Sequence, residues 1–227
     1  MRIGIIGSGR IGGNAGALFA QAGHDVFFSF SRDSARLDAL AAAAGAKAQA
    51  GSPADAAAFA DVLMLAVPWA MVDTALAAAG PLDGKILIDT TNQFGPDGPI
   101  VLPGGVTAAA FNQNRAPGAR LVKAFNALTA GFQAAAAGRA EDERAVLFLA
   151  GDAAAANATV ALLIESIGFA PVDLGPLATA AIMEAPRRPG SVYGEEYRPA
   201  AADQITRALR ADPAEASRLA VTLTFQT

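Results

Sequence analysis

The sequence predicts an α/β protein with a doubly wound parallel sheet and a small C-terminal extension or lobe. Short apolar runs alternate with longer alanine-rich stretches through the first half of the chain. The apolar runs are continuous, which is typical of parallel strands that helices cover on both faces. A glycine-rich turn, GSGRIGG, joins the first apolar run to the first helical stretch. Together these features favour alternating strands and helices in one layered sheet.

The elements are expected in a strand–helix order. Strands are expected at 2–6, 25–30, 46–50, 61–68, 85–91, 119–126, 144–152 and 169–175. Helices are expected at 9–23, 33–45, from Ser52 onward, at 71–79 and at 153–168, followed by a last helix, a break at Pro213 and another short element. Residues 92–105 and 183–199 read as loops because prolines and glycines gather there. We divide the chain into residues 1–118 and 119–227, and the second part either extends the same sheet or forms a small lobe.

Composition excludes several classes of site. The chain has no cysteine, which excludes disulfides, thiolate metal sites, iron–sulfur clusters and a cysteine nucleophile. The net charge of −4 comes without a basic stripe, so no nucleic-acid partner is expected. No apolar run has the length of a membrane span, and the N-terminus shows no signal-peptide pattern. We expect a soluble, cytoplasmic protein with no membrane partner, and no metal site because His, Asp and Glu do not cluster at ligand spacing.

The GxGxxG motif predicts a dinucleotide site in a Rossmann domain at residues 1–118. It follows a buried-type strand, opens a helix, and precedes a second strand, which is the context that this motif requires. The first glycine permits the tight turn, the second leaves room for the pyrophosphate, and the third lets the helix lie close to its strand. The expected cofactor contacts in this loop are Gly7, Ser8, Gly9, Arg10, Ile11 and Gly12.

The end of the second strand selects the dinucleotide. An NAD site places a carboxylate about 20 residues beyond the motif to bind the ribose 2′-hydroxyl, whereas this chain has Ser31 and Arg32 there. A serine hydroxyl and a guanidinium bind a 2′-phosphate that a carboxylate would repel. NADP(H) is therefore the expected cofactor. Arg36 is either a second positive charge or a solvated helix residue, and Asp33 is expected to cap the second helix.

A set of motifs occurs in one order: GIIGSGRIGG, SRDSARLDALAAAAGA, LAVPWA, ILIDTTN, RLVKAFNAL, FLAGD and LLIESIGFAPVDLGPL. Over about residues 1–180 this set resembles the family of NADP-dependent oxidoreductases that reduce or oxidise the deazaflavin coenzyme F420. It is also similar to the cytoplasmic domain of six-transmembrane ferric reductases, and the N-terminal half is distantly similar to pyrroline-5-carboxylate reductases. The resemblance implies coenzyme F420 or a flavin as the hydride acceptor.

The resemblance also implies that Val67, Pro68 and Trp69 lie beside the nicotinamide, although Trp69 is equally well explained as a core aromatic. Thr91 and Asn92 end the fifth strand, at the edge where open α/β sheets bind their ligands. Asn126, in the KAFN motif, is expected either to contact the cofactor amide or the acceptor, or to tie down a loop. No catalytic residue is assigned, and Asn126 and Trp69 are the candidates.

The loop from Arg187 to Tyr197 does not match the family pattern. One hypothesis is that Arg187 and Arg188 grip an acidic cofactor tail while Tyr193 or Tyr197 stacks on a flavin-like ring. The interpretation that we prefer is a solvated loop or a subunit contact.

Hydride transfer between stacked rings requires orientation and exclusion of water more than acid–base groups. The one histidine, His24, lies at a helix–strand junction away from the carboxyl edge and is expected to be structural. The expected function is therefore an NADPH-dependent oxidoreductase with a deazaflavin or flavin acceptor, acting as a homodimer. Three alternatives stay open: a flavin or ferric reductase, a small imine or carbonyl reductase of the pyrroline-5-carboxylate reductase type, and a non-catalytic NADP(H)-binding sensor module.

Overall fold

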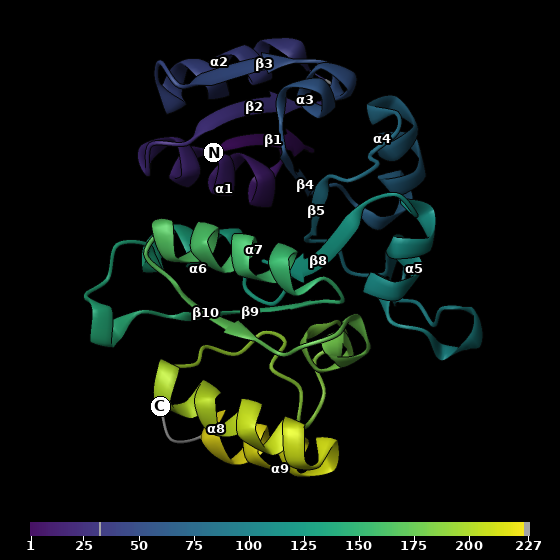
Figure 1. The fold of residues 1–227 in the computed structure, drawn as a ribbon, viewed down its shortest axis with the longest axis vertical. Helices are drawn as coiled ribbons and strands as arrows, with labels where there is room; N and C mark the ends of the chain where they lie inside the picture. The colour runs from purple at the N-terminus through teal and green to yellow at the C-terminus, as the bar shows by residue number, and fades with distance from the viewer. Residues whose placement is uncertain (32, 225–227) are drawn as a thin grey trace.

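The computed structural model describes residues 1–31 and 33–224. An eight-stranded sheet runs through it in the order β10-β9-β8-β5-β4-β1-β2-β3 (Figure 1). The strands are β1 (Arg2–Ile6), β2 (Asp25–Ser29), β3 (Ala48–Gly51), β4 (Val62–Leu65), β5 (Ile86–Asp89), β8 (Arg120–Ala124), β9 (Val146–Gly151) and β10 (Ala170–Asp173). The chain winds outward in both directions from the central pair β1 and β4, so the predicted doubly wound fold is confirmed.

One strand pair departs from the parallel arrangement. β9 runs antiparallel to β8, with Ala124 opposite Leu149, and β10 then pairs parallel to β9. The connection through α6 (Ala130–Ala136) and η3 (Glu141–Glu143) therefore returns the chain to the carboxyl edge of β8 before β9 begins. Every residue of β9 is buried. A strand covered on both faces has the same continuous apolar sequence in either direction, so its direction could not be predicted.

Two apolar cores lie on the two faces of the sheet because successive side chains of a strand point to opposite faces. Ile5 belongs to one core and Ile6 to the other. Four helices contribute to the first core: α1 (Arg10–Gln21), α2 (Ser34–Ala44), α6 and α7 (Ala154–Ser166). The opposite core is built with α3 (Pro53–Phe59), α4 (Val72–Ala79), α5 (Ala108–Arg115), η4 (Leu177–Met183), α8 (Pro199–Ala211) and α9 (Pro213–Thr224).

Local sequence signals account for several helix starts. Ser52 and Asp55 form a reciprocal capping box at α3, and Asp33 caps α2 by accepting a hydrogen bond from the Ala35 N–H at 3.0 Å, as expected. Two helices, α5 and α6, have no counterpart in the sequence prediction. Both begin at a threonine cap, Thr107 and Thr129 respectively, and both are short enough for their apolar pattern to be weak.

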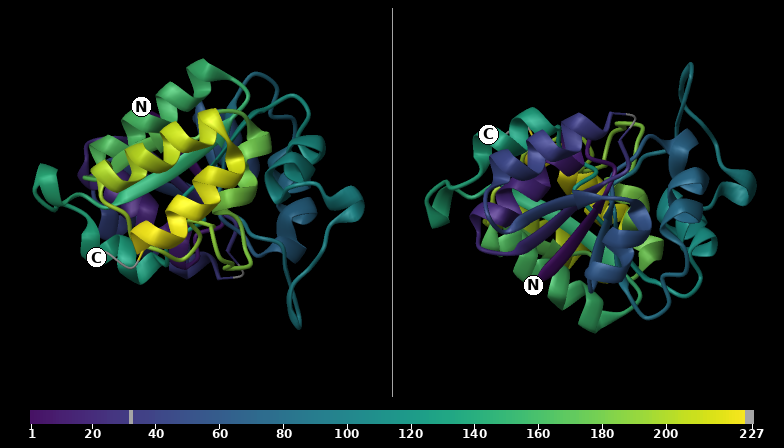
Figure 2. Two further views of the ribbon diagram at one scale, coloured as in Figure 1. Left: turned by 90° about the horizontal axis from the view of Figure 1, so that it is seen from below. Right: turned by 90° about the horizontal axis from the view of Figure 1, so that it is seen from above.

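The second half of the chain extends the same sheet, because β8 pairs directly with β5. The boundary at residue 118 remains a prediction. The expected loop at 92–105 contains a small antiparallel hairpin of β6 (Phe94–Gly95) and β7 (Gly98–Pro99), then η2 (Pro103–Gly105), and projects from the body in both views of Figure 2. At the C-terminus α9 is twelve residues long rather than a short element, and it lies side by side with α8 beyond β10 (Figures 1 and 2).

Candidate functional site

The three glycines of the motif occupy three different environments at the carboxyl end of β1. Gly7 has a φ of +107°, and a Cβ there would lie 2.5 Å from the Ala66 carbonyl oxygen. A Cβ on Gly12 would lie 2.1 Å from the Gly7 carbonyl oxygen, whereas one on Gly9 would meet nothing within 4 Å. Gly7 and Gly12 are therefore required by the protein's own packing. Gly9 instead borders open space, which is where the motif places the pyrophosphate.

The N-terminus of α1 faces the same open space. Gly9 is its N-cap residue and makes no side-chain cap, and its first turn carries no acidic residue. The Ser8 hydroxyl is buried and donates to the Ser29 carbonyl at 3.0 Å, so it does not satisfy the helix end. The N–H groups of the first turn are left for an external acceptor, and the helix dipole favours an anion there. The residues at this loop therefore fit a dinucleotide.

The end of β2 lies directly beside the glycine loop, since the Gly7 N–H donates to the Ser29 carbonyl at 3.0 Å. Phe30 follows with a φ of 58°, a left-handed conformation that is rare for a large side chain. The Ser31 hydroxyl accepts from the Asp33 N–H at 3.1 Å, and the Asp33 carboxylate is used as the helix cap. Arg32 lies outside the described residues, and Arg36 is exposed on α2.

The end of β4 brings Val67, Pro68 and Trp69 to the same edge. A Cβ on Gly7 would lie 2.7 Å from Val67 Cγ1, so this turn touches the glycine loop. Trp69 begins the short helix η1 (Trp69–Met71) and is buried against Leu102, Ala108 and Phe111 in a small apolar cluster. The Arg115 guanidinium lies 4.7 Å from its ring centroid. These contacts fix the indole in place and match the core-aromatic alternative for Trp69.

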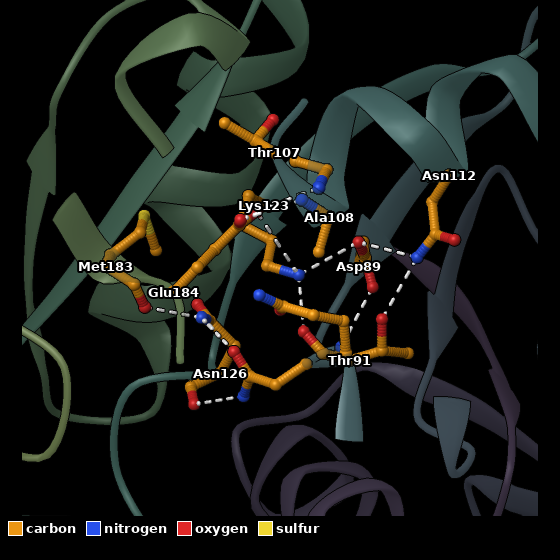
Figure 3. Close-up of polar contacts among 12 residues, drawn as sticks. Asp89, Thr91, Thr107, Ala108, Asn112, Lys123, Asn126, Met183 and Glu184 are labelled. Carbon is orange, nitrogen blue, oxygen red and sulfur yellow. Dashed lines mark hydrogen bonds and ion pairs between the residues drawn. The ribbon is translucent and has the colours of Figure 1, made fainter. Parts of the chain in front are cut away.

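A buried charged cluster lies where β5 and β8 end (Figure 3). Lys123 and Asp89 are neighbours in register on the two strands, both fully buried, with Nζ and Oδ2 3.0 Å apart. Asn112 of α5 donates from Nδ2 to Asp89 Oδ2 and to Thr91 Oγ1, both at 3.0 Å. The Thr91 carbonyl also accepts from Lys123. Thr91 is thus held from two sides by side chains that sequence reasoning did not assign to the site.

Glu184, the residue directly after η4, also belongs to this cluster. Its two carboxylate oxygens accept from the Ala108 and Ala109 N–H groups at 2.8 Å each, and Oε1 lies 3.9 Å from Lys123 Nζ. The carboxylate therefore supplies acceptors for the first turn of α5, where negative charge is stabilised by the helix dipole.

Asn126 and Asn92 make a second set of contacts to the same segment. Asn126 Nδ2 donates to the Met183 carbonyl at 2.6 Å and to Asn92 Oδ1 at 3.2 Å. Asn92 Oδ1 also accepts from the Ala185 N–H at 3.1 Å, and its own Nδ2 donates to the Asn126 carbonyl at 3.0 Å. Asn126 therefore ties down a loop, which is one of the two roles expected from the sequence. Its Oδ1 is buried and accepts no hydrogen bond.

These features share one edge because β8, β5, β4, β1 and β2 are adjacent parallel strands. In residues 1–31 and 33–224, no three His, Asp or Glu side chains gather closely enough to hold a metal ion. Nor does any helix in this described part have the length and apolar character to cross a membrane. The edge therefore offers backbone N–H groups, amides and one buried ion cluster.

Comparison with known proteins identifies the family. The family model described as "NADP oxidoreductase coenzyme F420-dependent" matches residues 2–93, the part that contains the glycine loop and the ends of β2, β4 and β5. Residues 2–93 therefore belong to this family. The family predicted from the sequence motifs is therefore confirmed.

Three relatives put the F420-dependent NADP oxidoreductase family in context. A hypothetical protein, SMa0349, from Sinorhizobium meliloti is 33% identical, with a TM-score of 0.75 over 87% of this chain and 95% of its own. A protein of Arthrobacter sp. FB24 described as a candidate F420-dependent NADP reductase is 29% identical, with a TM-score of 0.66 over 78% of this chain and 86% of its own. Metalloreductase STEAP3 of Rattus norvegicus is 30% identical over 81% of this chain. The chain spans only 36% of the length of that curated relative.

The structure brings most of the predicted residues of this family member to one edge and leaves others apart. The glycine loop, the turn from Val67 to Trp69, Thr91, Asn92 and Asn126 all lie there. Tyr197 does not: its ring is buried edge-to-face against Phe148, with centroids 5.6 Å apart, and its hydroxyl donates to the Ala220 carbonyl. The hypothesis that Tyr197 stacks on an acceptor is wrong, because its side chain is buried in the core against β9. Its carbonyl accepts from the Val146 N–H at the start of that strand.

The rest of that loop is arranged by its own contacts. Arg187 pairs with Glu195, and Arg188 donates to the Ala181 carbonyl. Tyr193 is partly buried, and burial raises the pKa of its hydroxyl. The loop is joined to the end of β8, since the Gly194 N–H donates to the Ala127 carbonyl at 2.9 Å.

Sequence reasoning did not assign four residues of the charged cluster to the site: Asp89, Asn112, Lys123 and Glu184. A signal was present for one pair. Asp89 and Lys123 are each the one charged residue in the interior or at the carboxyl end of an otherwise apolar strand, and a charge in such a position requires a partner. Asn112 and Glu184 carry no comparable signal, because a polar residue in a polar segment of sequence is ordinary.

Proposed function

We propose that the chain catalyses hydride transfer between NADP(H) and a deazaflavin- or flavin-type acceptor such as coenzyme F420. The observation that carries the proposal is the open space at Gly9 between two closely packed glycines, at a helix N-terminus without an internal cap. The family match over residues 2–93 supports the nucleotide and the reaction class. When bound at this loop, the nicotinamide would supply the hydride that passes to the acceptor ring.

The choice of NADP(H) over NAD(H) rests on the end of β2. The sequence has no carboxylate between Ser29 and Arg32 that could bind the ribose 2′-hydroxyl. The nearest carboxylate, that of Asp33, is used to cap α2. We propose that Ser31 and Arg32 bind the 2′-phosphate and that Arg36, which is exposed, adds a second positive charge.

The chain's own residues act by orientation. Val67 and Pro68 are proposed to pack beside the nicotinamide, and Thr91 and Asn92 to form the floor next to it. Asn126 Oδ1 is buried without a donor, which costs free energy. A carboxamide N–H of the nicotinamide, or an N–H of the acceptor ring, would satisfy it. Asn126 is therefore the catalytic candidate that we retain, and Trp69 supports the turn from the side.

A nucleotide titration tests the cofactor. Trp69 is the one tryptophan, so its emission follows binding. NADPH is expected to bind at least about tenfold more tightly than NADH, and Arg32→Ala to weaken NADPH about tenfold while leaving NADH unchanged. Arg210→Ala, an exposed arginine on α8, is the matched control for net charge. Equal affinities for the two nucleotides, or an equal loss for both in Arg32→Ala, would overturn the assignment.

An acceptor panel tests the reaction. Oxidised coenzyme F420, FMN, FAD, ferric chelates and a cyclic imine are each mixed with NADPH, and the absorbance of NADPH is followed. Turnover with coenzyme F420 or a flavin is the expected result. Turnover with ferric chelates alone would favour the second candidate, a ferric reductase, which the similarity to the rat metalloreductase supports. Imine turnover would favour the imine-reductase alternative, and tight NADPH binding with no turnover would favour a sensor.

The assembly and location are separate proposals. We propose a cytoplasmic homodimer without a nucleic-acid partner, on the sequence grounds given above. Light scattering on the purified chain tests the dimer: a mass near twice 22.8 kDa is expected, and a mass near 22.8 kDa would contradict it.

A further inference from the structure

We propose that Lys123 is a positioning residue whose buried ammonium group sets the separation between the two sides of the reaction site. One side is the cofactor turn, Asp89–Asn92, and the other is the acceptor segment, Met183–Ala185. The assignment of these two sides rests on the proposed function. The contacts themselves come from the described residues alone.

The ammonium group connects the two sides directly. Lys123 is 0% exposed, and Nζ faces Asp89 Oδ2 at 3.0 Å, the Thr91 carbonyl, and Glu184 Oε1 at 3.9 Å. An ammonium group has three N–H donors. Here two of them donate hydrogen bonds, to Asp89 and Thr91, and Glu184 completes the surroundings as an ion pair (Figure 3). Two of these partners belong to the cofactor turn and one to the acceptor segment, so a single buried group joins both.

The partners of Lys123 are themselves held in place. Asp89 Oδ1 accepts from the Thr91 N–H at 2.8 Å, and Oδ2 accepts from Asn112. Glu184 is fixed by the two N–H groups that begin α5. One ammonium group therefore lies between two carboxylates, and the positive end of the α5 dipole offsets part of the second negative charge. Removing the ammonium group would leave two buried carboxylates facing each other.

A neutral set of contacts supports the same segment independently. Asn126 and Asn92 hold the Met183 carbonyl and the Ala185 N–H, and Gln93 Nε2 donates to the Ala185 carbonyl at 2.8 Å. The segment therefore stays attached when Lys123 is changed, but it loses the contact that fixes its distance from Asp89. Reaction rates depend steeply on such distances, since a displacement of about 1 Å can cost about 100-fold.

The variants are chosen to separate positioning from folding. Lys123→Met keeps the length and removes the charge, and Glu184→Gln removes the charge on the acceptor side only. Lys85→Met is the matched control. Lys85 directly precedes β5, at the end of this strand opposite to Asp89, and its Nζ donates to the Ala60 carbonyl at 2.7 Å. It is expected to leave the hydride-transfer rate unchanged.

The kinetic test uses single-turnover hydride transfer and NADPH titration. Lys123→Met is expected to lower the transfer rate about 100-fold and to change the Kd for NADPH by less than about threefold. The double variant with Glu184→Gln is expected to be no slower than Lys123→Met, because the two residues act through one contact. An unchanged rate, or a loss of rate matched by an equal loss of NADPH affinity, would overturn the proposal. If Lys123→Met does not fold, the rate of Glu184→Gln decides by the same criteria, with a loss of about tenfold expected.

A second readout does not depend on activity. In Lys123→Met, amide hydrogen exchange at Ala108, Ala109 and Ala185 is expected to rise at least about tenfold while the amides of β1 and β2 stay unchanged. A uniform rise over all amides would mean a merely structural role and would overturn the proposal. If the unaltered protein transfers hydride to no acceptor, the proposed function fails, and the local or uniform exchange pattern still decides the role of Lys123.

Discussion

The glycine loop and the charged cluster lie on the same edge of the sheet but use opposite means to build a site. The loop presents backbone N–H groups and an open space at Gly9, and its one buried hydroxyl, on Ser8, is used internally. The cluster presents no backbone to an open space; instead it buries Lys123, Asp89 and Glu184 and satisfies each with a specific partner. The loop is therefore built to receive a ligand, and the cluster to hold other parts of the protein.

This difference has an energetic consequence. Substitutions in the loop act through steric contact, and their effect depends on whether the new atom meets protein or ligand. Substitutions in the cluster act through buried polar groups that lose their partners, which costs free energy whether or not a ligand is bound. Variants in the two regions should consequently separate binding from folding.

The largest contrast is expected within the loop itself. Gly12→Ala places a methyl group 2.1 Å from the Gly7 carbonyl oxygen, so the free energy of unfolding should fall by about 3 kcal/mol. Gly9→Ala meets no protein atom within 4 Å, so unfolding should change by less than about 0.5 kcal/mol. Its methyl group would occupy the space of the pyrophosphate, and the Kd for NADPH should rise at least about tenfold. Urea unfolding and nucleotide titration measure the two effects.

Gly131→Ala is the control for that pair. Gly131 lies in α6, and a Cβ there would also meet nothing within 4 Å. The substitution should therefore leave NADPH binding unchanged and raise helix stability by about 0.5–1 kcal/mol. Unaltered NADPH affinity in Gly9→Ala would contradict the assignment of the open space to the pyrophosphate.

A middle-sized effect is expected in the cluster. Asn112→Ala removes the donor to Asp89 Oδ2 and Thr91 Oγ1, so the free energy of unfolding should fall by about 2 kcal/mol and the melting temperature by about 4–8 °C. Asn114→Ala, an exposed asparagine of the same helix, is the matched control. The measurement is calorimetry without ligand, and equal melting temperatures for the two variants would show that the cluster contributes little to stability.

The same contrast explains what the sequence could predict. The glycine loop is contiguous and its strand–turn–helix context is local, so its residues could be proposed from one stretch of sequence. The fold class came from the alternation of apolar and helical stretches, and the family from motifs spread over about residues 1–180. Residues of the cluster come from β5, α5, β8 and the segment after η4, and they meet only once the sheet order is known. Asp89 and Lys123 carried the one usable signal, a charge in the interior or at the carboxyl end of each of two apolar strands.

The sequence also did not predict the direction of one strand or the burial of one loop side chain. β9 is buried on both faces, so its sequence does not distinguish the antiparallel pairing with β8 from a parallel one. Tyr197 lies in a segment rich in glycine, proline and charge, which predicts a solvated loop, yet its side chain packs on Phe148 below the sheet. Burial of a single side chain in a loop depends on tertiary packing, which local composition does not encode.

The smallest effect is expected at the opposite edge of the sheet, away from both regions, at His24. Its ring lies 2.9 Å from Ser166 Oγ and 3.2 Å from the N-terminal nitrogen, and burial, the N-terminal charge and Lys47 lower its pKa below 6.5. Below about pH 6.5 His24 therefore binds a proton more tightly in the unfolded chain than in the folded chain, which favours unfolding. The stability due to His24 is fully present above about pH 6.5 and is lost as the pH falls. Since the ring is partly exposed, the loss should stay below about 1 kcal/mol. Urea unfolding at about pH 5.5 and about pH 7.5 should show a smaller pH difference for His24→Gln than for the unaltered chain, and an identical pH difference in both would mean that His24 is as easily protonated in the fold as in the unfolded chain.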